Sequence, residues 1–163
     1  MPLSNFKIFS GEADDAISIM REVAQWCEDT GKSMWKLDKL TKDKLMKGLK
    51  EENFCIGKIG NENASSMILQ WHDPLFWPQI EENESGFIHK LCVRRKYAGM
   101  GLSKKMVEYA VEECKKKRIS YLRLDTSWSS QKLCALYENL GFIKVGRKVV
   151  GAEEYALYEL QIS

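Results

Sequence analysis

The feature that most constrains the fold is a strand, helix and strand pattern that occupies residues 86–126. Residues 86–93 and 121–126 are short apolar runs, which predicts two strands. Between them, apolar residues recur every four positions, as on the buried side of a helix: Leu102, Met106, Ala110 and Cys114. A helical crossover of this kind joins parallel strands. The loop at residues 94–101 is therefore expected at the carboxyl edge of the sheet, where ligands commonly bind.

The rest of the chain adds strands and helices around this crossover. Strands are expected at residues 5–9, 53–59, 64–71, 142–149 and 155–162, and helices at 16–27, 41–49, 102–117 and 130–140. Residues 60–63, Gly-Asn-Glu-Asn, favour the positive φ angles of a hairpin turn. Thr41 and either Ser129 or Ser130 are the expected helix N-caps. The order β-α-α-β-β-β-α-β-α-β-β predicts a mixed α/β fold with helices on both faces of the sheet.

Length and composition predict one globular domain over residues 1–163. The chain has 163 residues, of which 44% are hydrophobic and 29% charged, the balance of an ordinary folded protein. The net charge of +2 is too small for the protein as a whole to attract nucleic acid or an anionic membrane electrostatically. The run Lys115-Lys116-Lys117-Arg118 leaves nucleic-acid binding as an alternative, although a basic helix C-terminus is usually solvated. The expected partners therefore include no nucleic acid and no membrane.

The cysteines and the N-terminal segment indicate the cellular compartment in which the protein is expected. The five cysteines form no Cys-x-x-Cys pair, and an odd number favours reduced, buried thiols over a disulfide framework. Acidic residues from Glu12 onward come before any long apolar run, which is unlike a secretory leader. No stretch approaches the roughly 20 apolar residues of a membrane span. A cytoplasmic location is expected.

The strand-to-helix junction at residues 93–103 has the composition of an anion-binding loop. Gly99 and Gly101 let main-chain N–H groups approach a ligand closely, and the helix that follows offers unpaired donors and a favourable dipole. Arg94, Arg95 and Lys96 are additional cationic partners for a phosphate. A P-loop would need Lys and then Ser or Thr after its last glycine, and a dinucleotide fingerprint would need a third glycine. Neither is present.

Two motifs in this half of the chain together resemble the GNAT acetyltransferase superfamily. Residues 96–101, Lys-Tyr-Ala-Gly-Met-Gly, resemble its Gln/Arg-x-x-Gly-x-Gly/Ala loop, with lysine at the first position. Residues 136–142, Leu-Tyr-Glu-Asn-Leu-Gly-Phe, closely match its second signature, with a strand between the two. The resemblance covers residues 86–146 and is only topological elsewhere. It implies a mostly antiparallel sheet of six to seven strands and an acetyltransferase that uses acetyl-CoA to acylate a primary amine.

The resemblance also implies which residues hold the cofactor. The pyrophosphate is expected on backbone N–H groups of the loop and helix, and the thioester carbonyl on a main-chain N–H exposed by a bulge near Leu91 or Cys92. The expected cofactor-binding residues are Leu91, Cys92, Val93, Arg94, Lys96, Ala98, Gly99, Met100, Gly101, Leu102, Ser103, Ser130 and Tyr137.

Two residues are candidates for proton transfer. By the family pattern, the Tyr137 hydroxyl protonates the departing thiolate; the alternative is an aromatic packed in the core. His89 lies on the strand before the loop, in phase with Leu91 and Val93, and its ordinary pKa near 6.5 suits a general base. A structural role is equally open for His89. Cys92 has no base beside it in the sequence and is read as a packed residue.

The long loop at residues 72–85 combines aromatic rings with carboxylates. Such side chains suit a cationic amine through cation–π and ionic contacts, and the residues offered for substrate binding are Trp71, Asp73, Phe76, Trp77 and Glu81. The alternative is that the rings pack against the sheet and the acids are solvated. No metal is expected, since His72, Asp73 and His89 lack a recognisable ligand spacing.

The expected function has one alternative of another class. The first hypothesis is transfer of an acetyl group to an amine of a small molecule, which is favoured over a protein acceptor. The second is a catalytically silent acyl-CoA-binding module that regulates a partner through residues 72–85. A homodimer is left open, because no residue demonstrates one.

Overall fold

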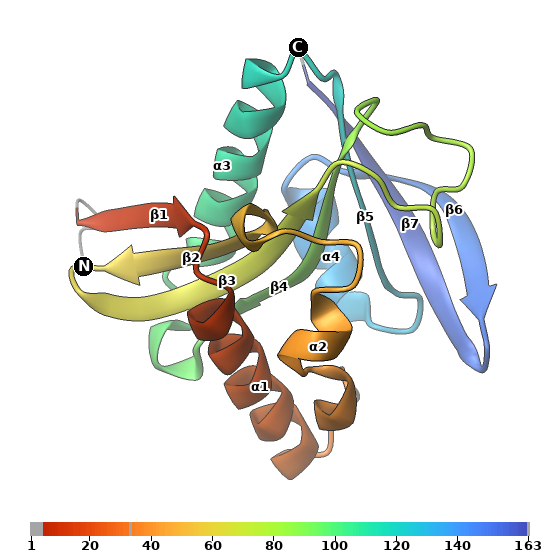
Figure 1. The fold of residues 1–163 in the computed structure, drawn as a ribbon. Helices are drawn as coiled ribbons and strands as arrows, with labels where there is room; N and C mark the ends of the chain where they lie inside the picture. The colour runs from red at the N-terminus through yellow and green to blue at the C-terminus, as the bar shows by residue number, and fades with distance from the viewer. Residues whose placement is uncertain (1–4, 33, 163) are drawn as a thin grey trace. The chain divides into compact units, whose positions relative to one another are not determined.

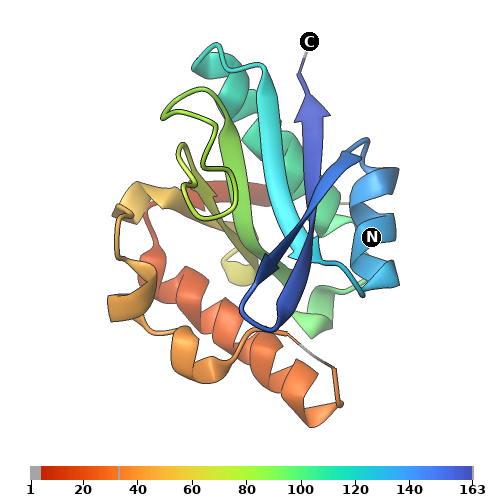
Figure 2. The same ribbon diagram turned by 90° about the vertical axis from the view of Figure 1, so that its right-hand side faces the viewer.

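The computed structural model describes residues 5–32 and 34–162. Its strands belong to one seven-stranded, mostly antiparallel sheet in the order β1-β2-β3-β4-β5-β7-β6, with β4 and β5 parallel (Figures 1 and 2). The elements are β1 Phe6–Ser10, α1 Ala13–Asp29, η1 Leu37–Lys39, α2 Lys42–Leu45, η2 Glu51–Asn53, β2 Phe54–Ile59, β3 Glu62–Gln70, β4 Gly86–Val93, η3 Arg95–Tyr97, α3 Leu102–Lys116, β5 Tyr121–Ser127, α4 Gln131–Asn139, β6 Ile143–Val150 and β7 Glu153–Gln161. The mixed fold and the parallel crossover are thus confirmed.

The second helix and the hairpin turn differ most clearly from the sequence predictions. The second helix is a single turn rather than a helix to residue 49, because the chain reaches Gly48 with a φ of 74°, outside the helical region. Its predicted N-cap is correct, since the Thr41 hydroxyl accepts the Lys44 N–H at 3.3 Å. The hairpin turn is also tighter than predicted, with β3 already beginning at Glu62 and Gly60 at a φ of 61°. Ser130, not Ser129, caps α4.

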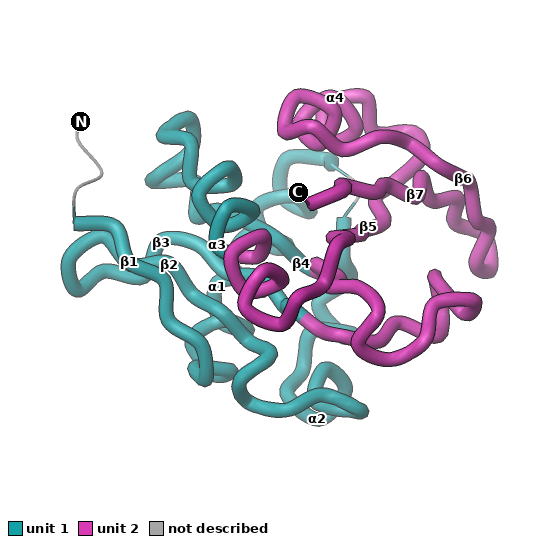
Figure 3. The backbone as a smooth tube through the Cα atoms, turned by 90° about the horizontal axis from the view of Figure 1, so that it is seen from above, with its two compact units in different colours: residues 1–69, 90–109 teal, residues 70–89, 110–163 magenta. Residues whose placement is uncertain are grey.

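The chain divides into two compact units, each made of two separate stretches of the sequence (Figure 3). The first comprises Met1–Leu69 and Lys90–Tyr109, and the second comprises Gln70–His89 and Ala110–Ser163. Strand β4 and helix α3 each contribute residues to both units. The single domain over residues 1–163 stays a prediction.

In the first unit, helices cover both faces of the β2–β3 hairpin. Ser65 and Ser66 are neighbours on β3, so their side chains point to opposite faces. The Ser66 hydroxyl donates to the Ala16 carbonyl of α1 at 3.1 Å, whereas the Ser65 hydroxyl contacts the Met106 sulfur of α3 at 3.2 Å. The apolar side of α1 packs on Phe54, Ile56 and Ile68, which are all buried. The prediction of helices on both faces therefore holds in this unit.

In the second unit, the first residues of β4 pair with β5, and β5 pairs with β7. The parallel ladder runs from Gly86↔Leu122 to Ile88↔Leu124, and β5 is antiparallel to β7 with Leu124 opposite Tyr158. Alternation along the strands gives the sheet two unlike faces. Ile88, Leu124 and Tyr158 are buried on one face, while charged and aromatic side chains of the same strands occupy the other. That second face carries the cluster described below.

The cysteines match a further prediction. All five cysteines are free thiols and buried. Among the described residues, no helix is long and apolar enough to cross a membrane.

Candidate functional site

The loop at residues 94–101 is held in place by backbone and apolar contacts of the first unit. The Arg94 N–H donates to the Ala64 carbonyl of β3 at 2.8 Å, and the buried Tyr97 packs in a small cluster with Ala64 and Leu102. Gly99 and Gly101 then adopt φ angles of 79° and 78°, which only glycine adopts without strain. No atom lies within 4 Å of where a Cβ would stand at either glycine. The loop thus presents bare main chain to open space.

The start of α3 supplies hydrogen-bond donors beside these glycines. The Lys105 N–H donates to the Gly101 carbonyl at 3.3 Å, and this hydrogen bond closes the first turn of α3. The N–H groups of Leu102 and Ser103 precede that bond and so have no acceptor within the helix. The Ala98 N–H, by contrast, already donates to the Arg95 carbonyl at 3.2 Å. Open space, N–H groups without an acceptor in the helix, and a 15-residue helix together suit a phosphate group.

The cationic side chains of this loop already have partners. Arg94 Nε donates to Glu22 at 2.9 Å, and its Nη1 donates to the Asn63 carbonyl at 3.0 Å. Lys96 pairs with Glu62, and the hydrogen bond from Lys96 is the main reason that the pKa of the Glu62 carboxyl lies below its usual range. Anion binding by this loop therefore falls mainly to the backbone.

Strand β4 contains a left-handed residue that sequence reasoning did not identify. Lys90 has a φ of 58°, an uncommon conformation for a residue inside a strand. It comes directly before Leu91 and Cys92, where a bulge was expected. The Cys92 thiol lies 3.7 Å from the Ser66 hydroxyl, and burial raises its pKa to about 12. A thiol in that state is protonated at neutral pH, which agrees with a packed rather than a nucleophilic residue.

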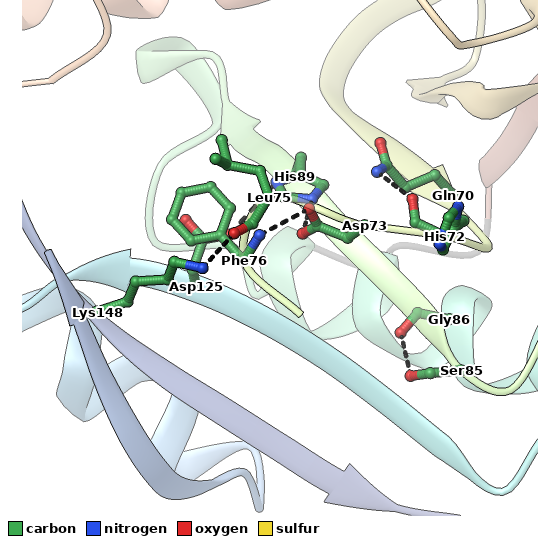
Figure 4. Close-up of polar contacts among 10 residues, drawn as sticks. All are labelled: Gln70, His72, Asp73, Leu75, Phe76, Ser85, Gly86, His89, Asp125 and Lys148. Atoms are coloured by element: carbon green, nitrogen blue, oxygen red, sulfur yellow. Dashed lines mark hydrogen bonds and ion pairs between the residues drawn. The ribbon is translucent and has the colours of Figure 1, made fainter. Parts of the chain in front are cut away.

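The second unit brings Asp73 and His89 together. Asp73 Oδ2 lies 2.9 Å from His89 Nε2, and the side chains are 6% and 19% exposed, respectively (Figure 4). The Phe76 N–H donates to Asp73 Oδ1 at 3.2 Å, so the loop's own backbone orients the carboxylate. These contacts join two of the residues that the sequence offered, one as a base and one as a substrate contact.

Asp125 of β5 faces the other nitrogen of the same imidazole. His89 Nδ1 and Asp125 Oδ1 are 3.5 Å apart, and the Asp125 side chain is 10% exposed. The strand register explains the contact: Ile88 is opposite Leu124 in the parallel ladder, so the next residues along both strands are His89 and Asp125. The imidazole thus lies between two carboxylates.

The environment keeps Asp73 ionised. Burial alone would raise its pKa, but the hydrogen bond from His89 and the N–H groups of Phe76 and Leu75 outweigh that effect and hold the pKa below its usual range. Asp73 is therefore a carboxylate, an acceptor only, at neutral pH.

Aromatic rings border this cluster. The Phe76 ring meets the Tyr155 ring edge-on with centroids 5.0 Å apart and lies 6.2 Å from the His89 ring. Burial, followed by the negative charge of Asp125, raises the pKa of the Tyr155 hydroxyl. Lys148 of β6 donates to the Leu75 carbonyl and so ties the loop to the sheet (Figure 4).

Three other residues predicted to bind the substrate make their contacts outside the cluster around His89. Trp77 is 2% exposed and packs against Phe87 and Arg123, as a core residue does. Trp71 lies under the Lys117 ammonium at 4.8 Å. The Glu81 N–H bonds to Glu84 within an exposed turn. Of the loop residues offered, Asp73 and Phe76 are the ones found beside His89.

Tyr137 is a buried residue of α4. Its ring lies 5.9 Å from Phe142 and 6.3 Å from Tyr158, between centroids. Tyr158 is opposite Leu124 in the β5–β7 ladder, so within this unit Tyr137 packs on the face of the sheet opposite to Asp125. The Ser130 hydroxyl accepts the Leu133 N–H at 3.3 Å as the cap of α4. The cofactor-binding role of both residues and the proton-transfer role of Tyr137 stay predictions.

The cluster has the composition of a cation site. One ligand atom each from Asp73, His89 and Asp125 can be chosen so that all lie within 4.8 Å of one another. His72, considered in the sequence, is not a member of this group. Its carboxylate oxygens and imidazole nitrogen can coordinate a divalent metal or accept hydrogen bonds from an ammonium group.

Sequence reasoning missed Asp125, Tyr155 and Lys148. For Asp125 the signal was weak: it is a carboxylate that directly follows the buried Leu124 in the strand. For Tyr155 and Lys148 there was none, because their contacts depend on where the loop lies over the sheet.

Comparisons with known proteins agree with the motifs. A model described as the acetyltransferase (GNAT) family matches residues 19–142. The uncharacterized N-acetyltransferase YesJ of Bacillus subtilis (strain 168) is 24% identical over 166 residues, covering 93% of this chain and 86% of the relative. The match extends well beyond the two motifs.

Solved structures show the same fold. A GNAT family acetyltransferase from Listeria monocytogenes 4b F2365 has a TM-score of 0.74 at 18% identity, covering 96% of this chain and 95% of that chain. The acetyltransferase yncA from Salmonella typhimurium, determined with its cofactor acetyl-CoA, has a TM-score of 0.66 at 11% identity, covering 98% and 95%.

Proposed function

This chain belongs to the acetyltransferase (GNAT) family, and from that premise we propose that it transfers an acetyl group from acetyl-CoA to a primary amine of a small molecule. The observation that carries the proposal is the bare loop of Gly99 and Gly101 at the start of α3, whose geometry suits a pyrophosphate. The presence of acetyl-CoA in the structure of yncA supports the same cofactor.

The residues present fit this cofactor. The N–H groups of residues 99–103 would hold the pyrophosphate, at on the order of 1.5 to 3 kcal/mol for each hydrogen bond to a charged oxygen. When bound, acetyl-CoA supplies a thioester whose carbonyl carbon the amine attacks. Arg94 and Lys96 would assist only by exchanging their present carboxylate partners for phosphate oxygens.

We assign the two proton transfers to different residues. His89 accepts a proton from the amine at an imidazole nitrogen, so that the nitrogen lone pair is free to attack. Tyr137, which packs on the face of the sheet opposite to Asp125, would donate its hydroxyl proton to the departing thiolate sulfur, so the assignment requires the thioester to be reached from both faces. Asp73 holds the imidazole, and the burial of His89 limits competition from bulk water.

A turnover assay tests the proposal. Release of CoA thiol is followed with acetyl-CoA and a panel of small primary amines, for the wild type, Tyr137→Phe and the control Tyr121→Phe, which loses only a hydroxyl elsewhere in the unit. The proposal predicts turnover that falls about 100-fold in Tyr137→Phe and is unchanged in the control. Acetyl-CoA binding without turnover on any amine would instead indicate the silent binding module.

A further inference from the structure

Lys148 of the edge strand β6 donates a hydrogen bond to the Leu75 carbonyl (Figure 4). In the strand register Lys148 is opposite Tyr155 of β7, and Tyr155 is opposite Ser127 of β5. Ser127 and Asp125 are two positions apart on β5, so these side chains share the sheet face that carries the cluster described above. A cation of the sheet therefore binds the loop through its main chain.

The carbonyl that accepts from Lys148 and the N–H that donates to Asp73 belong to the same peptide unit. The Leu75 carbonyl carbon is bonded to the Phe76 nitrogen, and the Phe76 N–H donates to Asp73 Oδ1 at 3.2 Å. A positive charge at the carbonyl oxygen draws electron density along the amide and makes its N–H a stronger donor, because hydrogen bonds in a chain polarise one another. Lys148 therefore strengthens the contact that orients the Asp73 carboxylate.

Every hydrogen bond of this chain has only one possible direction. The Lys148 ammonium and the Phe76 N–H only donate, whereas the peptide carbonyl and the ionised Asp73 carboxylate only accept. The 2.9 Å contact of Asp73 Oδ2 therefore requires a hydrogen on His89 Nε2. In the neutral ring the lone pair is then on Nδ1. The tautomer of His89 is thus set by a series of contacts that begins at Lys148.

The turn at residues 73–77 needs this contact with the sheet. The Asp73 carbonyl accepts the Trp77 N–H at 2.9 Å, which closes the turn, and the buried Trp77 ring fixes its far end. The middle of the turn lacks such packing, since the Leu75 side chain is 56% exposed. Its carbonyl bond to Lys148 therefore holds the peptide that orients Asp73.

Two other cations of β6 have partners of a different kind. Arg147 pairs with Glu154 of β7, and the Lys144 ammonium lies over the Trp128 ring at 4.6 Å. Arg147 precedes Lys148 directly, so its side chain points to the opposite face of the sheet. The strand thus offers Arg147 as a matched control, a neighbouring cation whose loss leaves the loop contact in place.

We infer that Lys148 is a positioning residue for His89, acting through the Leu75–Phe76 peptide and Asp73. The inference rests on the proposed function for its effect on rate, because it takes His89 as the general base. Lys148 keeps its own protons throughout the reaction, and no proton passes along the series. Its contribution is to hold the imidazole in one tautomer and one orientation.

NMR tests the inference without turnover. The variants are Lys148→Met, which keeps an apolar stem without the ammonium, Lys148→Arg, which keeps a charged donor, and the control Arg147→Met. In Lys148→Met the Phe76 amide hydrogen should exchange with solvent about tenfold faster than in the wild type. The share of His89 rings with the hydrogen on Nδ1 should rise. Lys148→Arg should recover most of both effects, and Arg147→Met should match the wild type.

Steady-state kinetics with acetyl-CoA and the amine panel gives the second readout. Lys148→Met should lower kcat by about five- to tenfold, because a looser imidazole is less often in the productive geometry. The KM for acetyl-CoA should change by less than about twofold, since the glycine loop is untouched. Lys148→Arg should restore at least about half of the wild-type kcat. A loss of kcat that is equal in Lys148→Met and Lys148→Arg would overturn the inference.

The outcomes separate the inference from the proposed function. An unchanged Phe76 exchange rate and an unchanged His89 tautomer in Lys148→Met would overturn the inference and leave acetyl transfer standing. A wild-type neutral ring with its hydrogen on Nδ1 would overturn it even if Lys148→Met failed to fold. The predicted NMR changes in a protein that releases no thiol with any amine would support the positioning role and contradict the proposed function.

Discussion

The glycine loop before α3 and the cluster around His89 are built in opposite ways. In the loop, the main chain at Gly99 and Gly101 is bare, and the nearby cations Arg94 and Lys96 are paired with carboxylates of the same unit. In the cluster, side chains provide the chemistry and the backbone only orients them, as the Phe76 N–H does for Asp73. The glycine loop depends on backbone conformation, whereas the cluster around His89 depends on which side chains are present.

This difference teaches how each site responds to substitution. A backbone site tolerates the loss of neighbouring side chains but not a change in φ, since its donors are N–H groups that every residue has. A side-chain site is more sensitive to small shifts of its own backbone than to substitutions at distant positions. It loses its function when one of its side-chain groups is replaced. The predictions below test this contrast from the largest expected effect to the smallest.

Replacing His89 by alanine should remove the general base. We expect kcat to fall by about 100-fold or more, while the affinity for acetyl-CoA stays within about twofold of the wild type. Steady-state kinetics and calorimetry on the same sample measure the two quantities. His72→Ala, at the exposed histidine of the neighbouring loop, is the matched control. A similar loss in both variants would show that the effect is structural and not catalytic.

Replacing Asp73 by asparagine should release the imidazole and lower kcat by about tenfold. Because the folded-state pKa of Asp73 lies below its usual value, its contribution to stability is present above the unfolded pKa, about 3.9, and is lost as the pH falls through the folded pKa. Chemical denaturation should therefore show wild type more stable than Asp73→Asn by about 1 to 3 kcal/mol at pH 7. The difference should shrink toward pH 3.

Nitrogen NMR of the His89 ring distinguishes positioning from mere packing in that variant. The wild-type ring should carry its hydrogen on Nε2, and Asp73→Asn should shift the tautomer balance. An unchanged tautomer together with a tenfold loss of kcat would contradict the positioning role.

Replacing Lys96 by alanine should have the smallest effect. Lys96 is exposed and paired with Glu62, so its loss removes only a surface ion pair and should weaken acetyl-CoA binding by less than about fivefold. Calorimetric titration measures the change, with Lys47→Ala as an exposed control. A loss of 50-fold or more would mean that the side chain, and not the main chain, carries the phosphate site.

The sequence predicted the glycine loop well for a physical reason. Gly99 and Gly101 are required by local backbone conformation, and local conformation is encoded in a short stretch of chain. The same holds for the crossover, whose helix period and flanking strands determine that β4 and β5 are parallel. Local sequence patterns were therefore enough to predict the fold and the glycine loop, which is one of the two parts of the candidate site.

The cluster around His89 was predicted only in part. His89 and Asp73 were named, but their contact depends on the course of a loop with no periodicity. Asp125 was missed because a carboxylate inside a strand has no meaning until the register places it beside His89. Side-chain sites assembled from distant segments need the register and the loop path, and neither can be read from spacing alone.

The most direct test of the central claim is calorimetric titration of acetyl-CoA into the wild type and into the double variant Gly99→Trp, Gly101→Trp. The control is Gly31→Trp, Gly151→Trp, because these glycines also have positive φ angles, 72° and 62°, with no atom within 4 Å of a Cβ. We predict stoichiometric binding to the wild type and the control, and none to the loop variant. Absence of binding to the wild type, or equal binding to all three proteins, would contradict the assignment of this loop as the acetyl-CoA site.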